Sequence, residues 1–186
     1  MTLVKATFTT MRRQIIVTGP ESAGKTSLSQ KLAEAFDAVW IPEYARGYLE
    51  AVDRKAISED FPHFVQAINQ LIEAGFRQQE RAKKEPAIVI QDTSHEILHL
   101  WQADKFVLSS LVDAAFKNSR PDVYVLCMPD LPWESDPLRE DPHRRQELFL
   151  AIRDLLKTSG VPLIEVSGFG ESRTKNAQKQ LERILR

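Results

Sequence analysis

Residues 19–26 combine the chemical groups that hold a polyphosphate. They read Gly-Pro-Glu-Ser-Ala-Gly-Lys-Thr, which fits the pattern GxxxxGK[ST], and they follow a short apolar run and precede an amphipathic segment. Backbone N–H groups of such a loop cradle anions, Lys25 adds positive charge, and the Thr26 hydroxyl can bind magnesium. We therefore expect ATP and Mg²⁺ to be bound, with contacts from Gly19, Glu21, Ser22, Ala23, Gly24, Lys25, Thr26 and Ser27.

Two further apolar runs end in polar side chains that suit the acceptor of a phosphoryl group. Residues 40–46 read Trp-Ile-Pro-Glu-Tyr-Ala-Arg. Glu43 and Arg46 can hold sugar hydroxyls and Tyr44 can stack on a ring, although Glu43 also suits the first turn of a helix. Asp92 follows the run at 87–91. It suits three roles: positioning magnesium, accepting the proton of an attacking hydroxyl, or capping the next helix. Glu43 is the other candidate for accepting that proton, so the catalytic base is expected to be Asp92 or Glu43.

Residues 129–145 are crowded with proline and charge and follow a fourth apolar run. A kinase needs cations that arrive with substrate and exclude water, so we expect a lid in this segment. Its candidate cations are Arg139, as a catalytic residue, Arg144, as a nucleotide contact, and Arg145. A solvated basic loop is the alternative, since runs of charge are usually solvated.

Three other features are candidate ligand contacts. Ser167 and Gly168 form a turn that could hold adenine or could simply connect a strand to a helix. Trp101 and Trp133 could stack on a flat heteroaromatic substrate, whereas Trp40 is expected in the core, where large aromatic side chains are more common.

Residues 95–99 read His-Glu-Ile-Leu-His, which on a helix places both imidazoles on one face, as in zinc peptidases. The other histidines are His63 and His143, and the sequence offers no evident third zinc ligand. We therefore disfavour zinc and consider instead that one of these histidines contacts substrate. Cys127, inside an apolar run, is expected to be buried and inert.

The elements that must position these groups alternate between apolar runs and amphipathic segments. This order is typical of an α/β fold with a parallel sheet. We expect five strands, with helices on both faces of the sheet. The strands are expected at 14–18, 38–41, 87–91, 122–128 and 162–166, and the helices at 25–36, 43–53, 61–84, 94–102, 108–117, 144–157 and 172–185.

Length and charge limit the kinds of protein this chain can be. Its 186 residues suit one domain, which we place at 13–186 after an N-terminal extension at 1–12. We find no transmembrane run or secretory signal, so we expect a cytoplasmic protein. Lys and Arg number 25 against 26 Asp and Glu, a balance that disfavours nucleic acid and favours a small-molecule partner.

Four segments in order resemble the ribosylnicotinamide kinase domain of NadR-type proteins, from about Arg13 onward. They are GPESAGKT at 19–26, PEYAR at 42–46, Asp92-Thr93, and DLPWESDPLR at 130–139. The resemblance implies a P-loop kinase that makes nicotinamide mononucleotide from nicotinamide riboside and ATP in NAD salvage, standing alone without an adenylyltransferase domain. It also implies that Glu43, Tyr44 and Arg46 lie at the acceptor site and that Asp92 is the catalytic carboxylate.

Two alternatives to a nicotinamide riboside kinase remain open. One is a kinase for another nucleoside or metabolite, and the other is a nucleotide-dependent regulatory ATPase. A GTPase is disfavoured because residues 128–131 read Met-Pro-Asp-Leu where a guanine-reading stretch is expected.

Overall fold

The computed structural model describes residues 11–139 and 141–186, so most of the expected extension at 1–12 lies outside the described residues. Five parallel strands form one sheet in the order β2-β3-β1-β4-β5. They are β1 (Arg12–Thr18), β2 (Val39–Ile41), β3 (Ala87–Asp92), β4 (Val123–Cys127) and β5 (Leu163–Val166). The middle of β1, at Ile15, Ile16 and Val17, is completely buried, as expected of a central strand that is covered on both faces.

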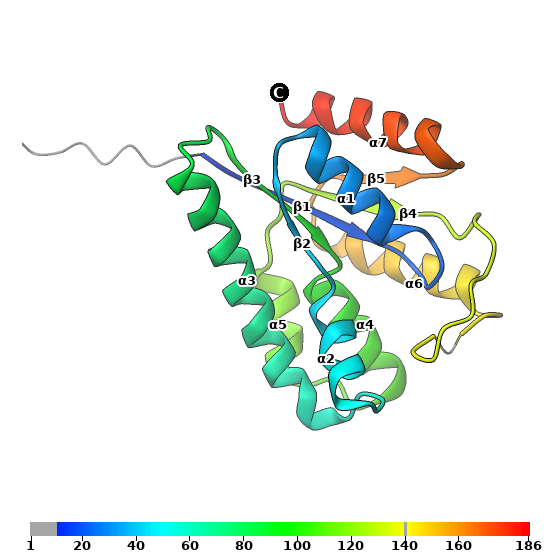
Figure 1. The fold of residues 1–186 in the computed structure, drawn as a ribbon. Coiled ribbons are helices and arrows are strands. Elements are labelled where there is room, and N and C mark those ends of the chain that lie inside the picture. Colours follow the sequence, from blue (N-terminus) through cyan, green and yellow to red (C-terminus); the bar gives the residue numbers. More distant parts are fainter. Residues whose placement is uncertain (1–10, 140) are drawn as a thin grey trace, which may run out of the picture.

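Helices cover both faces of this sheet (Figure 1). The helices α1 (Lys25–Ala35) and α7 (Gly170–Ile184) contact each other and pack on one face. The other face carries α3 (Phe61–Arg81), α4 (His95–Lys105), α5 (Ser110–Asn118) and α6 (Arg145–Thr158). A short helix, α2 (Tyr44–Val52), and a 3₁₀ turn, η1 (Ser58–Asp60), follow β2. The predicted α/β class is confirmed, and element boundaries differ from the predicted ones by at most three residues.

The strand order brings distant parts of the sequence to one edge of the sheet. β1 pairs with β3 on one side, where Val17 lies opposite Asp92, and with β4 on the other, where Val17 lies opposite Val125. The segments after β1, β3 and β4 therefore emerge together at the carboxyl ends of adjacent strands. In open parallel sheets this edge is where ligands bind.

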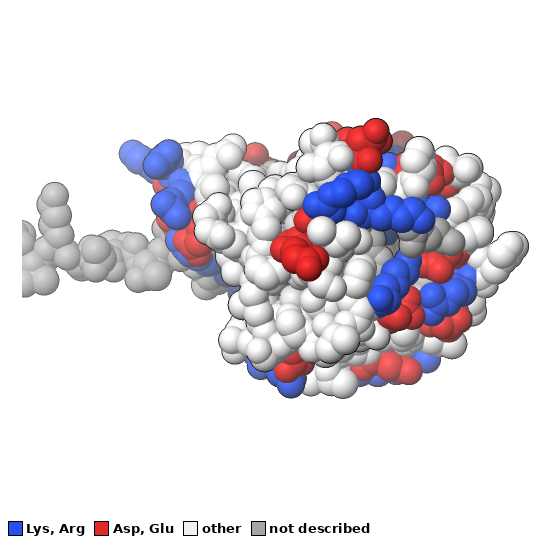
Figure 2. Space-filling view, turned by 90° about the horizontal axis from the view of Figure 1, so that it is seen from below, with Lys and Arg blue, Asp and Glu red and all other residues white. Residues whose placement is uncertain are grey.

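The surface carries mixed charge, and Figure 2 shows basic and acidic side chains interleaved on the face seen from below. No helix in the described part of the chain combines the length and the apolar character needed to cross a membrane.

Candidate active site

The segment between β1 and α1 is a tight loop that only glycine can complete at two positions. Gly19 has φ 146°, and a Cβ there would lie 2.7 Å from the carbonyl oxygen of Cys127 in β4. Gly24 has φ 73° and immediately precedes α1. The Lys25 ammonium donates to the Pro20 carbonyl at 3.0 Å, across the loop. The backbone thus curls around the N-terminus of α1, as an anion cradle requires.

Thr26 and Asp92 meet beside this loop. The Thr26 hydroxyl donates to Asp92 Oδ2 at 2.5 Å. Asp92 is buried, and its Oδ1 has no hydrogen-bond partner among the described residues. Burial raises the pKa of Asp92, while the positive charge of Lys25 opposes that rise. A hydroxyl and an unpaired carboxylate oxygen are the hard oxygen ligands that Mg²⁺ prefers, so these residues fit the expected metal.

Neither carboxylate of the predicted site serves as a helix cap. Glu43 occupies the N-cap position of α2, but its side chain makes no capping hydrogen bond. The N-cap of α4 is Ser94 rather than Asp92. Burial raises the pKa of Glu43, Lys25 lowers it, and Asp92 raises it further. Glu43 and Lys25 line one space, and Asp92 lies behind it, bonded to Thr26, which lines the same space.

That space is a cavity of about 400 Å³ that extends from the phosphate loop to α2, α4 and the segment after β4. Glu43, Arg46 and Trp101 lie in its wall. The rest of the wall away from the loop mixes apolar and charged side chains. The apolar ones include Leu49, Ile97, Leu100, Leu138, Leu148 and Ile152, and the charged ones include Asp104, Lys105, Glu134 and Asp141. One end of the cavity is therefore built for anions and the other for a ring with polar edges.

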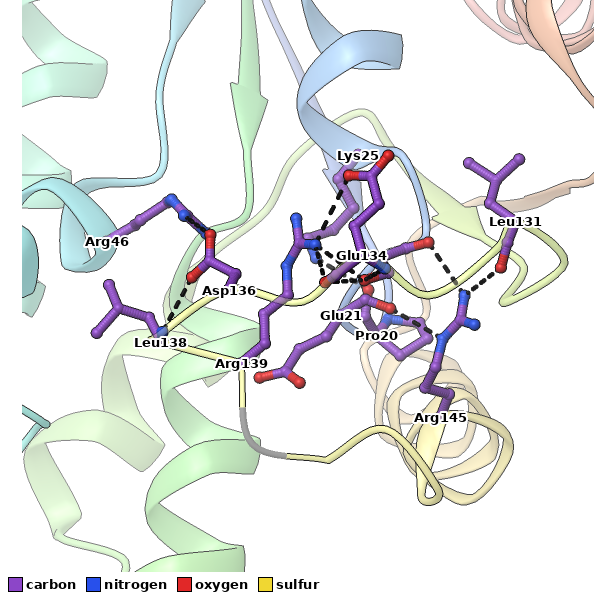
Figure 3. A network of polar contacts seen from close by, with 11 residues as sticks. Pro20, Glu21, Lys25, Arg46, Leu131, Glu134, Asp136, Leu138, Arg139 and Arg145 are labelled. Carbon is purple, nitrogen blue, oxygen red and sulfur yellow. Dashed lines mark hydrogen bonds and ion pairs between the residues drawn. The ribbon is translucent and has the colours of Figure 1, made fainter.

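The described residues on either side of position 140 in the expected lid contact the phosphate loop, through Arg139 on one side and Arg145 on the other (Figure 3). Arg139 Nη1 donates to the Ser22 hydroxyl at 3.0 Å and to the Glu134 carbonyl at 2.5 Å, and Arg139 lines the cavity. Asp136 pairs with Arg46 of α2. The segment is thus held to both ends of the site, and Arg139 is the predicted lid cation that reaches the cavity wall.

Other predicted contacts lie outside the cavity wall. Arg144 forms ion pairs with Asp104 at 2.8 Å and Glu147 at 2.7 Å. Arg145 donates to backbone carbonyls of the phosphate loop instead of facing the cavity. The remaining predicted residues outside the wall are Asp92, Ser27, Tyr44, Trp133, Ser167 and Gly168, of which Asp92 meets the cavity only through its hydrogen bond to Thr26. Ligand contacts at all of these positions stay predictions.

Tyr44 shows why a strand-end aromatic did not reach the cavity. Its hydroxyl hydrogen-bonds His63 Nε2 at 2.6 Å, and its ring packs edge-on against Phe64. The side chain therefore belongs to the contact between α2 and α3.

One face of α4 forms a wall of the cavity, and of its lining residues Trp101 alone was predicted to contact a ligand. Ile97, Trp101 and Asp104 line the cavity, together with Leu100 and Lys105. Their spacing is helical, so a search for one face of this helix would have grouped them. The His-Glu-x-x-His pattern drew attention to other positions on the same helix.

The two histidines of that pattern have separate partners. His95 Nδ1 contacts the Ser94 hydroxyl at 3.2 Å, and burial lowers the pKa of His95 to about 4. His99 Nε2 contacts Asp113 Oδ1 at 3.3 Å. Within the described ranges, no three His, Cys, Asp or Glu side chains are grouped so that they could hold a metal ion. Cys127 is buried, and burial raises its pKa.

Fold and site together define a P-loop nucleotide-binding protein, because the phosphate loop and the Thr26–Asp92 pair meet at the carboxyl edge of a parallel sheet. Residues 14–173 match the sequence model of the family described as AAA domain, and the chain belongs to that family. No curated protein sequence matches the chain.

Solved structures share the fold. The NadR protein in complex with NR gives a TM-score of 0.78 at 19% identity, covering 94% of this chain and 52% of that one. NadR in complex with NAD and AMP-PNP gives a TM-score of 0.74 at 18% identity, covering 94% of this chain and 49% of that one. Thymidylate kinase from Ehrlichia chaffeensis gives a TM-score of 0.61 at 16% identity, covering 95% of this chain and 100% of that one. The chain thus spans about half the length of the NadR structures, and the predicted resemblance is confirmed for the fold.

Proposed function

We propose that this chain is a magnesium-dependent kinase that transfers the γ-phosphoryl group of ATP to nicotinamide riboside, forming nicotinamide mononucleotide. One observation carries the proposal. A single cavity joins the phosphate loop, with Thr26 and its buried partner Asp92 behind it, to Glu43 and to a chamber walled by both apolar and charged side chains. A protein that only bound a nucleotide would have no use for a second chamber lined by a carboxylate.

The loop side of the cavity suits ATP. Its backbone N–H groups and Lys25 would hold the β- and γ-phosphates. Thr26 and Asp92 would hold Mg²⁺, with the unpaired Asp92 Oδ1 as one ligand atom. Magnesium bound there would offset the negative charge that develops during phosphoryl transfer. Arg139, which already reaches the cavity wall from the lid, would add positive charge on the opposite side.

The chamber side suits a nucleoside. Arg46 would hold the ribose hydroxyls, and Trp101 would stack on the base. Glu43 would accept the proton of the ribose 5′-hydroxyl. The 5′-oxygen would then bond to the γ-phosphorus of ATP while the bond between that phosphorus and ADP breaks. We assign this role to Glu43 rather than Asp92 because Asp92 Oδ2 already accepts from Thr26. Burial raises the pKa of Glu43, which makes it a stronger proton acceptor.

The choice of nicotinamide riboside rests on the four motif segments and on the likeness to NadR in complex with NR. Thymidylate kinase shares the fold, so the acceptor needs its own test. Purified protein would be given MgATP with nicotinamide riboside, with other nucleosides, or with no acceptor, and products would be followed by mass. Nicotinamide mononucleotide formed far faster than any other product supports the proposal. A preferred different nucleoside, or ATP hydrolysis that no acceptor stimulates, refutes it.

Two variants separate the assigned roles. Glu43→Gln should lower kcat by at least about 100-fold, the usual contribution of a general base, with little change in ATP affinity. Asp92→Asn should raise the Mg²⁺ concentration needed for half-maximal rate. The control is Glu59→Gln, an exposed position after α2 that should keep normal kinetics. Full activity in Glu43→Gln would contradict the assignment of the base.

A further inference from the structure

Three consecutive peptide carbonyls of the phosphate loop accept hydrogen bonds from arginines outside it. Arg145, at the start of α6, donates through Nε to the Glu21 carbonyl at 3.1 Å and through Nη2 to the Ser22 carbonyl at 3.0 Å. Arg173, on α7, donates through Nη2 to the Ala23 carbonyl at 2.8 Å. Neither arginine is part of the cavity wall. Both therefore act on the back of the loop.

A planar trans peptide links each of these carbonyls to the next N–H group. Within one peptide unit the C=O and the N–H point in opposite directions. Holding the carbonyls of residues 21, 22 and 23 therefore turns the N–H groups of Ser22, Ala23 and Gly24 away from the two guanidinium groups. These N–H groups belong to the stretch of the loop that forms the anion cradle.

Arg173 is in addition a junction between three loops. Its side chain is only 5% exposed. Nη1 donates to Asp130 Oδ1 at 2.6 Å and to the Gly168 carbonyl at 2.9 Å, so it reaches the segments after β4 and β5 as well as the phosphate loop. The partner carboxylate and the carbonyls offset the cost of burying this charge. Only a planar fork with several donors can make these contacts at once.

Arg145 links the phosphate loop to the beginning of the lid segment. Its Nη2 also donates to the Leu131 carbonyl at 3.0 Å. Figure 3 shows its guanidinium between Leu131 on one side and the phosphate loop on the other. Although its position in the sequence is that of a lid cation, its donors point at backbone rather than into the cavity.

We infer that Arg145 and Arg173 are positioning residues that hold the phosphate loop in its anion-binding shape without touching the nucleotide. The inference rests on the nucleotide binding of the proposed function and on neither its acceptor nor its base. A loop fixed in advance binds phosphate without a further ordering cost. Loss of either arginine should therefore weaken binding of polyphosphates and leave acceptor recognition intact.

The test compares Arg145→Lys and Arg173→Lys with the unaltered protein by titration calorimetry. The probes are MgATP and inorganic tripolyphosphate, which share the phosphates but not the base. Each variant should bind both probes at least about tenfold more weakly, the scale of one charge-assisted hydrogen bond. The KM for whichever acceptor the unaltered protein phosphorylates, measured at saturating MgATP, should stay within about twofold of the unaltered value, since neither arginine is part of the cavity wall. Arg183→Lys, exposed on the same helix α7, is the matched control.

The outcomes separate this inference from the proposed function. If the unaltered protein binds neither probe, the proposed function is wrong. If it binds them and both folded variants bind equally well, the inference is overturned. Equal losses for acceptor and polyphosphate would also overturn it, because they would show general damage to the fold. Circular dichroism reports folding, and if Arg173→Lys does not fold, the half-buried Arg145 decides the question through Arg145→Lys.

Discussion

Glu96 offers a direct test of the energetics behind the site. Its side chain is buried, with 1% of the residue exposed, and Oε1 accepts the Ser94 N–H at 3.0 Å. Oε2 has no hydrogen-bond partner among the described residues. Burial raises its pKa from 4.5 to about 7, although the backbone N–H groups of Glu96 and Ser94 oppose the rise. The folded protein therefore keeps a proton on Glu96 that the unfolded chain releases.

The sign of the effect on stability follows from that difference. Below pH 4.5 both states hold the proton, and Glu96 carries no penalty. As pH rises toward about 7, the unfolded state loses its proton first, so the free energy of unfolding falls. At about 1.4 kcal/mol for each tenfold difference in proton affinity, the penalty reaches about 3 kcal/mol by pH 8.

The variant Glu96→Gln removes this penalty while keeping the shape of the side chain and the acceptor for the Ser94 N–H. We expect its stability relative to the unaltered protein to be greater at pH 8 than at pH 5 by about 2.5 kcal/mol, because part of the penalty is already present at pH 5. Urea unfolding of both proteins at the two pH values measures this change. Because the variant is compared with the unaltered protein, titrations common to both, such as that of His95, cancel. Glu59→Gln, at an exposed position, is the control. A stability difference that is the same at both pH values would refute the reasoning.

Three further predictions concern stability alone. The Asp60 carboxylate accepts two hydrogen bonds from Arg54, at 2.7 and 2.8 Å, and these lower the pKa of Asp60 to about 2. The free energy of unfolding should therefore fall as pH drops from about 4 toward 2, and circular dichroism should show a smaller fall in Asp60→Asn. Gly19→Ala should lower the free energy of unfolding, measured in urea, by at least about 2 kcal/mol, because the added Cβ would meet a backbone oxygen. Gly160→Ala, at φ 71° in open space, should lower it by about 1 kcal/mol, and equal losses would contradict this reasoning. Gly47→Ala, exposed inside α2 with no atom nearby, should raise stability by about 1 kcal/mol by thermal melting, and a loss would count against the open space seen there.

The strands, the helices and the phosphate loop could be predicted from the amino-acid sequence. Continuous apolar runs could only be strands covered on both faces, and the glycine spacing before Lys25 could only be completed by a loop at a helix start. The position of Asp92 at the ligand-binding edge of the sheet could also be predicted, because it ends a strand and the carboxyl ends of parallel strands meet at that edge. These features depend on local periodicity and on backbone sterics, which a sequence displays directly.

The partners of the long charged side chains could not be predicted from the sequence, because they depend on how the elements pack together. Arg139, Arg144 and Arg145 are near neighbours in the sequence, yet they meet Ser22 of the phosphate loop, Asp104 of α4 and the loop carbonyls respectively. A flexible side chain with several donors takes the partner that the packed elements bring within reach, and those partners are 40 or more residues away. The cavity wall on α4 and the role of Arg173 were likewise fixed by how the helices and the loops after β1, β4 and β5 pack together.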